Sequence, residues 1–146
     1  MNQHRFSAFC ISGMLLCGLA ESAAGASEIK GAAILDHPCG KVAVKQMGLA
    51  HDGKMDEANT LTTKEMQDQW KAMPAKDRTA MLGMMKEISP TGEQYSADIK
   101  SGGVLVVDGE TAKLTVTKKT QDKTGSSTST TKQNFRLDGS QCLVDR

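Results

Sequence analysis

The spacing of apolar residues changes midway along the chain, and this change constrains the fold more than any other feature. Between residues 36 and 88 apolar side chains recur at helical spacing, as Cys39, Ala43 and Met47 do. Between residues 93 and 145 apolar and polar residues alternate, which is typical of strands. Helices followed by strands predict an α+β domain, in which N-terminal helices pack on a curved antiparallel sheet.

Capping and breaking residues divide the helical half into segments. Asp36 is expected to cap the first helix, and Gly53 to end it. Thr62 and Glu65 have the spacing of a capping box and are expected to open a later helix. Pro74 ends that helix, and a further helix follows it.

The second half is expected to contain strands joined by short turns. Tyr95, Ala97 and Ile99 alternate with polar residues and predict a half-buried strand. Asp108-Gly109 is a strong hairpin signal, and Asp138-Gly139 predicts a second turn. Residues 122–125 are expected to form another turn, followed by a strand rich in serine and threonine.

The N-terminus has the composition of a secretory signal peptide. Residues 6–19 are apolar and uncharged, and Ala24-Gly25-Ala26 predicts cleavage before Ser27. A membrane-spanning helix needs about 20 apolar residues, so we expect no transmembrane anchor in the mature chain. Lipid attachment at Cys10 or Cys17 is the alternative.

The expected organisation is therefore a signal peptide over residues 1–26, a linker over 27–35 and one domain over 36–146. The protein is expected in the periplasm or outside the cell, with a lipid-anchored form as the alternative.

Two cysteines, Cys39 and Cys142, remain after cleavage. An even number of cysteines in an exported chain predicts a disulfide, and two cysteines allow one pairing. The alternative is two buried free thiols. The bond would join the first helix to the last strand.

The charge balance gives no reason to expect a nucleic-acid partner, because the formal net charge is only +1. His37 and His51 do not form a standard zinc pattern with Cys39 and nearby acids. We therefore predict no metal and no cofactor.

The methionines of the mature chain lie together in sequence, between Met47 and Met85. Met81, Met84 and Met85 share a helical stripe. Methionine is a common core filler, but it also lines adaptable binding surfaces. The candidate ligand or partner site comprises Trp70, Met81, Met84, Met85 and Tyr95.

Several features together resemble one known fold family. An amphipathic helix leads to Asp52-Gly53-Lys54 and Met55-Asp56-Glu57-Ala58, and two Asp-Gly hairpins follow. This pattern resembles the nuclear-transport-factor-two-like superfamily, in particular an exported bacterial branch of uncharacterised proteins. The resemblance implies a cone-shaped, cystatin-like roll with a pocket between helices and sheet. The superfamily includes the ketosteroid-isomerase group. The catalytic acids and tyrosine of that group have no match in this sequence, so no catalytic residue is assigned.

The expected function is non-catalytic binding or protein interaction in the cell envelope. The partner would be a protein or a small apolar ligand, and a homodimer through the sheet is a further expectation. An immunity protein that neutralises an exported antibacterial effector is the alternative, and a small isomerase-like enzyme is a weaker one. We predict no enzymatic activity, because no nucleophile, base and orienting group form a recognisable motif.

Overall fold

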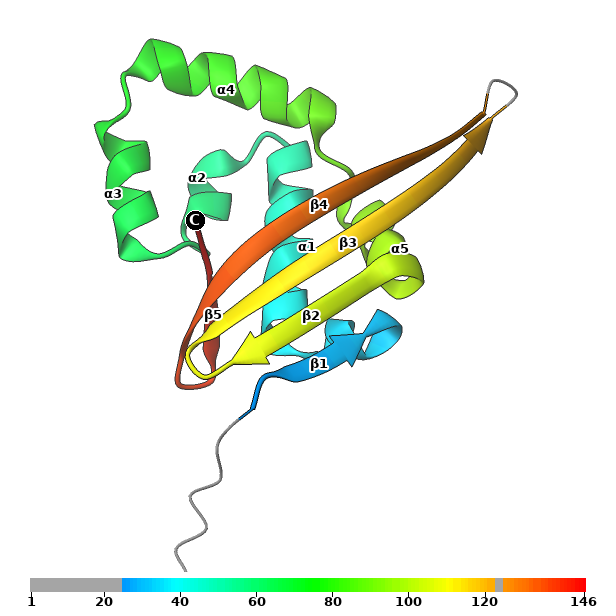
Figure 1. Cartoon of the computed structure of the whole chain (residues 1–146). Helices are drawn as coiled ribbons and strands as arrows, with labels where there is room; N and C mark the ends of the chain where they lie inside the picture. Colours follow the sequence, from blue (N-terminus) through cyan, green and yellow to red (C-terminus); the bar gives the residue numbers. More distant parts are fainter. Residues whose placement is uncertain (1–24, 123–124) are drawn as a thin grey trace, which may run out of the picture.

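The computed structural model describes residues 25–122 and 125–146 (Figure 1). The expected signal peptide up to residue 24, including Cys10 and Cys17, lies outside the described residues. The N-terminal elements are β1 (Ser27–Lys30) and a 3-10 helix, η1 (Gly31–Asp36). The α-helices are α1 (Pro38–His51), α2 (Met55–Asn59), α3 (Lys64–Ala72), α4 (Ala75–Ile88) and α5 (Gly92–Gly102). The remaining strands are β2 (Gly103–Asp108), β3 (Thr111–Asp122), β4 (Gly125–Asp138) and β5 (Gln141–Asp145).

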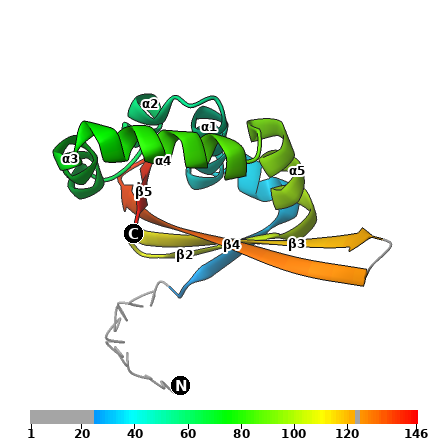
Figure 2. The same ribbon diagram turned by 90° about the horizontal axis from the view of Figure 1, so that it is seen from above.

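The strands form one open antiparallel sheet in the order β1-β2-β3-β4-β5. The predicted α+β class is therefore confirmed, and the helices lie together on one side of the sheet (Figure 2). The hairpin turns at Asp108-Gly109 and Asp138-Gly139 are also confirmed. Gly109 has φ 55° and Gly139 has φ 59°, which are conformations that favour glycine. Strands β3 and β4 extend well beyond their neighbours as a two-stranded ribbon (Figure 1).

Residues 27–35, expected as a linker, contribute regular structure to the domain. Residues 27–30 pair as β1 with residues 104–107 of β2. The following 3-10 helix carries Ile34, which is fully buried. The segment is therefore part of both the sheet and the core.

Helix α1 begins where expected, but its capping residue differs. Asp36 was expected as the cap; instead the Nδ1 atom of His37 accepts a hydrogen bond from the backbone N–H of Cys39 at 3.2 Å. Pro38 occupies the first turn, where its missing N–H costs nothing. Asp52 and Gly53 follow the helix, as predicted.

The expected capping box at Thr62 and Glu65 does not form. Thr63 is the N-cap of α3, and no side chain makes a capping hydrogen bond there. Residues 61–63 instead lie along β5, because the Thr63 N–H donates to the Val144 carbonyl and the Val144 N–H to the Leu61 carbonyl, both at 2.9 Å. This pairing joins the entry to α3 to the edge of the sheet.

The predicted strand around Tyr95 is wrong, because residues 92–102 form helix α5. Thr91 and Gln94 make a reciprocal capping box that stabilises its first turn. Tyr95 and Ile99 are buried while Ala97 is exposed, which matches helical spacing and contradicts strict alternation. The helix therefore presents Tyr95 and Ile99 to the core from one face.

The core lies between the sheet and the layer formed by η1, α1 and α5. Its largest fully buried side chains are Phe135, Ile34, Ile99, Leu105 and Leu114. The predicted disulfide between Cys39 and Cys142 is present and joins α1 to β5 across this core. In the described part of the chain, no helix is long and apolar enough to cross a membrane.

Candidate functional site

Trp70 is held in place by a hydrogen bond from its indole ring. The residue lies on α3 and is 8% exposed. Its Nε1–H donates to the Oδ1 atom of Asp56 on α2 at 2.7 Å. Because a buried indole N–H needs an acceptor, this bond fixes the ring orientation and ties α3 to α2. Asp56 was not among the predicted site residues.

An open cavity of about 200 Å³ lies beside the indole ring. Helices α1, α2, α3 and α4 and the loops next to them supply its walls. Four methionines and the tryptophan make up most of its apolar surface, with Gln46, Asn59, Thr62 and Gln69 as the polar part. The methionines are Met55, Met66, Met73 and Met81.

The methionines of the described residues are less buried than the core side chains. Every methionine between Met47 and Met85 is described, and none of them is among the buried hydrophobic residues. Met47 packs half-buried against the rim of the core, and the four that line the cavity are also half-buried. The burial pattern therefore does not support the interpretation of the methionines as core filler.

The structure brings together only part of the predicted site. Trp70 and Met81 line the same cavity, whereas Met84 and Met85 are not among its lining residues. Met84 is 54% exposed and lies next to Ile88, which is 66% exposed. Since α4 turns about 100° per residue, neighbours on a broad apolar stripe can face different surroundings.

Tyr95 belongs to the core rather than to the cavity wall. Its hydroxyl donates to Gln133 Oε1 at 3.0 Å, and Gln133 Nε2 donates to Gln46 Oε1 at 2.9 Å. Gln46 in turn lines the methionine cavity, so a chain of polar side chains leads from Tyr95 to the site. Burial, together with the nearby Asp98 carboxylate, raises the pKa of Tyr95 to about 12.

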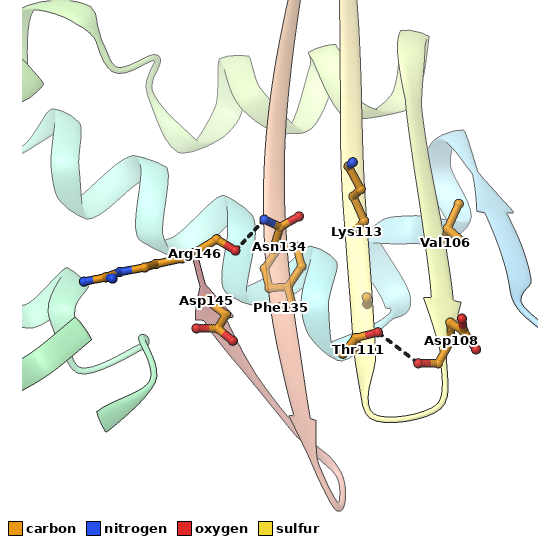
Figure 3. Close-up of a pocket in the computed structure, with 9 residues that line it drawn as sticks. Val106, Asp108, Thr111, Lys113, Asn134, Phe135, Asp145 and Arg146 are labelled. Carbon is orange, nitrogen blue, oxygen red and sulfur yellow. Dashed lines mark hydrogen bonds between the residues drawn. The ribbon is translucent and has the colours of Figure 1, made fainter. Parts of the chain in front are cut away.

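A second depression, of about 360 Å³, lies on the sheet near the C-terminus (Figure 3). Two pairs of its lining residues are joined by hydrogen bonds. Thr111 Oγ1 donates to the Asp108 carbonyl at 3.0 Å, and Asn134 Nδ2 donates to the Arg146 carbonyl. Burial acts to raise the pKa of Asp145, but bonds with the Arg146 backbone and with Arg136 outweigh it and lower that pKa. This depression has less apolar character than the methionine cavity.

The two described histidines both contact the backbone. His37 caps α1, and burial lowers its pKa. His51 Nδ1 lies 2.9 Å from the Ser89 carbonyl oxygen. Within residues 25–122 and 125–146, no group of three or more His, Cys, Asp or Glu side chains is arranged to hold a metal ion.

Comparison of the chain with protein-family models, curated proteins and solved structures yields no match. The geometry of the site is therefore the basis on which we infer a function.

Proposed function

We propose that this protein is a non-catalytic binding module of the bacterial cell envelope, and that the methionine-lined cavity is its binding site. The proposal includes export by a cleaved signal peptide and residence in the periplasm or outside the cell. It also includes membership of the exported nuclear-transport-factor-two-like branch with its cone-shaped roll. The disulfide is compatible with export, because such bonds persist in oxidising compartments.

The position of the methionines is the observation that carries the proposal. The largest buried side chains of the core are branched or aromatic, whereas four methionines line an open cavity beside Trp70. Methionine side chains are flexible and polarizable, so a wall of them adapts to apolar groups of different shape. Trp70 adds a large flat surface held in a fixed orientation by Asp56.

The proposal excludes catalysis because the cavity is poor in titratable groups. Its lining consists of methionines, the tryptophan, amide side chains and one threonine. General acid-base or nucleophilic chemistry needs a titratable side chain at the reacting atoms. The nearby carboxylate of Asp56 accepts the Trp70 N–H and has a structural part in the site.

The chain contains one tryptophan, so the fluorescence of Trp70 reports directly on the cavity. We expect a neutral naphthylamine probe to quench this fluorescence in a saturable manner. Polar substitution of lining residues, Met66→Gln or Met81→Gln, is expected to weaken probe binding. Met84→Gln, on the exposed side of α4, is the matched control and is expected to have no effect.

The same variants test for a natural partner in envelope extracts. A partner that binds through the cavity should be captured by the wild type and by Met84→Gln but lost with Met66→Gln. Circular dichroism establishes that each variant is folded. Capture that is equal for all variants, together with no saturable probe binding, would contradict the assignment of the cavity as the binding site.

An immunity protein remains the alternative, with the sheet face opposite the helices as its surface. The observation that favours it is that, in the described part of the chain, the helices lie together on one side of the sheet (Figure 2). A secreted toxin encoded beside this chain, and neutralised by the purified protein, would support this alternative. Substitutions in the cavity would then leave neutralisation unchanged.

A further inference from the structure

We propose that the methionine-lined cavity binds a soft monovalent metal cation, Cu(I), through methionine thioethers beside the indole of Trp70. The inference rests on the proposed function, in that it takes the same cavity to be a binding site. It goes further by assigning the chemistry to sulfur rather than to apolar surface alone. The ligands are drawn from Met55, Met66, Met73 and Met81.

Thioethers are soft ligands, and among biological metals they select Cu(I). The cavity places four of them around one volume of about 200 Å³. The two cysteine sulfur atoms in the described residues, those of Cys39 and Cys142, are joined in a disulfide and do not compete. The described residues also lack a cluster of the nitrogen, thiolate and carboxylate ligands that zinc or harder cations prefer.

The electrostatics of the cavity suit a single positive charge. Among the described residues, no lysine or arginine lines the cavity; Arg78 lies in a neighbouring depression that Trp70 and Asp56 also line. The face of an indole attracts cations more strongly than the other aromatic rings do. The Asp56 carboxylate, which accepts the Trp70 N–H at 2.7 Å, adds negative charge at the edge of the same ring. A monovalent ion also loses less hydration energy on entering such a site than a divalent one.

The packing of the outer helices leaves the sulfur atoms free to converge. Met55 lies on α2, Met66 on α3 and Met81 on α4, while Met73 is the C-cap of α3. None of these side chains is fixed in the core, and methionine has several rotatable bonds. No residue of α4 is buried, so its position can adjust when a ligand joins it to α2 and α3.

Silver provides the first test, because Ag(I) resembles Cu(I) as a soft monovalent cation but does not change oxidation state under these conditions. The exported protein is titrated with silver nitrate in chloride-free buffer, with Trp70 fluorescence and methionine-methyl NMR as readouts. We expect quenching of Trp70 and shifts of the Met55, Met66, Met73 and Met81 methyl resonances. Met47, Met84 and Met85 should stay unchanged. A Cu(I) titration under anaerobic conditions should shift the same resonances.

Leucine substitution separates sulfur chemistry from apolar packing, because leucine and methionine have similar volumes. The test variant is Met66→Leu/Met73→Leu/Met81→Leu, and the matched control is Met47→Leu/Met84→Leu/Met85→Leu. Loss of these thioethers is expected to lower silver affinity by about ten-fold or more, the scale on which altering metal-site partners acts. The control variant should keep wild-type affinity.

Full silver affinity in the test variant, or shifts confined to methionines outside the cavity, would overturn the proposal. Silver binding that is lost in His37→Ala or His51→Ala but kept in the test variant would also overturn the proposal. The naphthylamine probe distinguishes the two claims. If the wild type binds both the probe and silver, and the leucine variant binds only the probe, apolar binding and metal binding are both supported. If the wild type binds the probe but not silver, only the metal proposal fails. If silver binds as expected and the probe does not, apolar-ligand binding fails instead.

Discussion

The inner layer next to the sheet and the outer group of helices use apolar side chains in opposite ways. In the inner layer Ile34, Cys39 and Ile99 are fully buried. In the outer group α4 has no buried residue, and Ile88 is 66% exposed. We therefore expect the inner layer to contribute most of the stability, and the outer group to offer adaptable surface.

The residue types in the two regions suit these tasks. Branched and aromatic side chains have few rotamers, so packing them in the core loses little entropy and defines one arrangement. Methionine loses more entropy when fixed but adapts better when left free. Methionine, which is absent from the buried core among the described residues, therefore suits a cavity whose walls must move toward a ligand.

The largest effect is expected from removing the disulfide, which lies in the inner layer. The bond closes a sequence separation of 103 residues. In the chain-entropy model, such a loop stabilises the fold by about 4 to 5 kcal/mol. Cys39→Ser/Cys142→Ser should lower the free energy of unfolding toward this extent in urea denaturation. Probe binding per folded molecule should stay the same, because neither cysteine lines the cavity. A loss below about 1 kcal/mol would contradict the assignment of stability to this layer.

A matched pair of isoleucines tests the comparison directly. Ile34→Ala removes a fully buried side chain and is expected to cost about 2 to 5 kcal/mol. Ile88→Ala removes the same atoms from α4, where the residue is 66% exposed. We expect a change within about 0.5 kcal/mol there, because surface substitutions remove little packing. Similar costs for both variants, measured by urea denaturation, would show that α4 is packed more tightly than its exposure indicates.

The effect expected from Tyr95 appears only at alkaline pH, so it is absent under ordinary conditions. Burial, with the Asp98 carboxylate, raises its pKa to about 12 in the folded state, from an ordinary value of 10.0. The neutral phenol therefore stabilises the fold below pH 10, and this contribution is lost as pH rises through the folded pKa. A shift of this size corresponds to about 2 to 3 kcal/mol. Because the chain has one tyrosine, phenolate absorbance follows Tyr95 directly.

Tyr95→Phe is the control for this titration. The part of the alkaline destabilisation that depends on the phenol should disappear, while the part from lysine titration should remain. An ordinary tyrosine pKa in the folded protein would contradict the buried placement. A shift of the phenolate titration on silver binding would show that the two regions communicate through Gln133 and Gln46.

Sequence reasoning succeeded where the signal was local or the choices were few. The Asp-Gly turns were predictable because each needs a positive φ at glycine within a few residues. The Cys39–Cys142 pairing followed from the predicted cleavage, which leaves two of the four cysteines and therefore one possible bond. Residues 93–100 were assigned wrongly because Tyr95 and Ile99 are four apart, a spacing that satisfies both strand alternation and one turn of helix. The Thr91–Gln94 capping box was the local signal that resolves this ambiguity.

The sequence by itself determined the α+β class, the two Asp-Gly hairpin turns, and the concentration of methionine in one region. Only the tertiary structure decided which methionines line the same cavity. Met81 and Met84 belong to the same stripe of α4, yet Met81 lines the cavity and Met84 is largely exposed. The physical reason is that helical spacing sets which residues share a side of a helix. What that side faces depends on how α2 and α4 pack on α1 and how α3 packs on α2. These are contacts between parts of the chain that are distant in sequence.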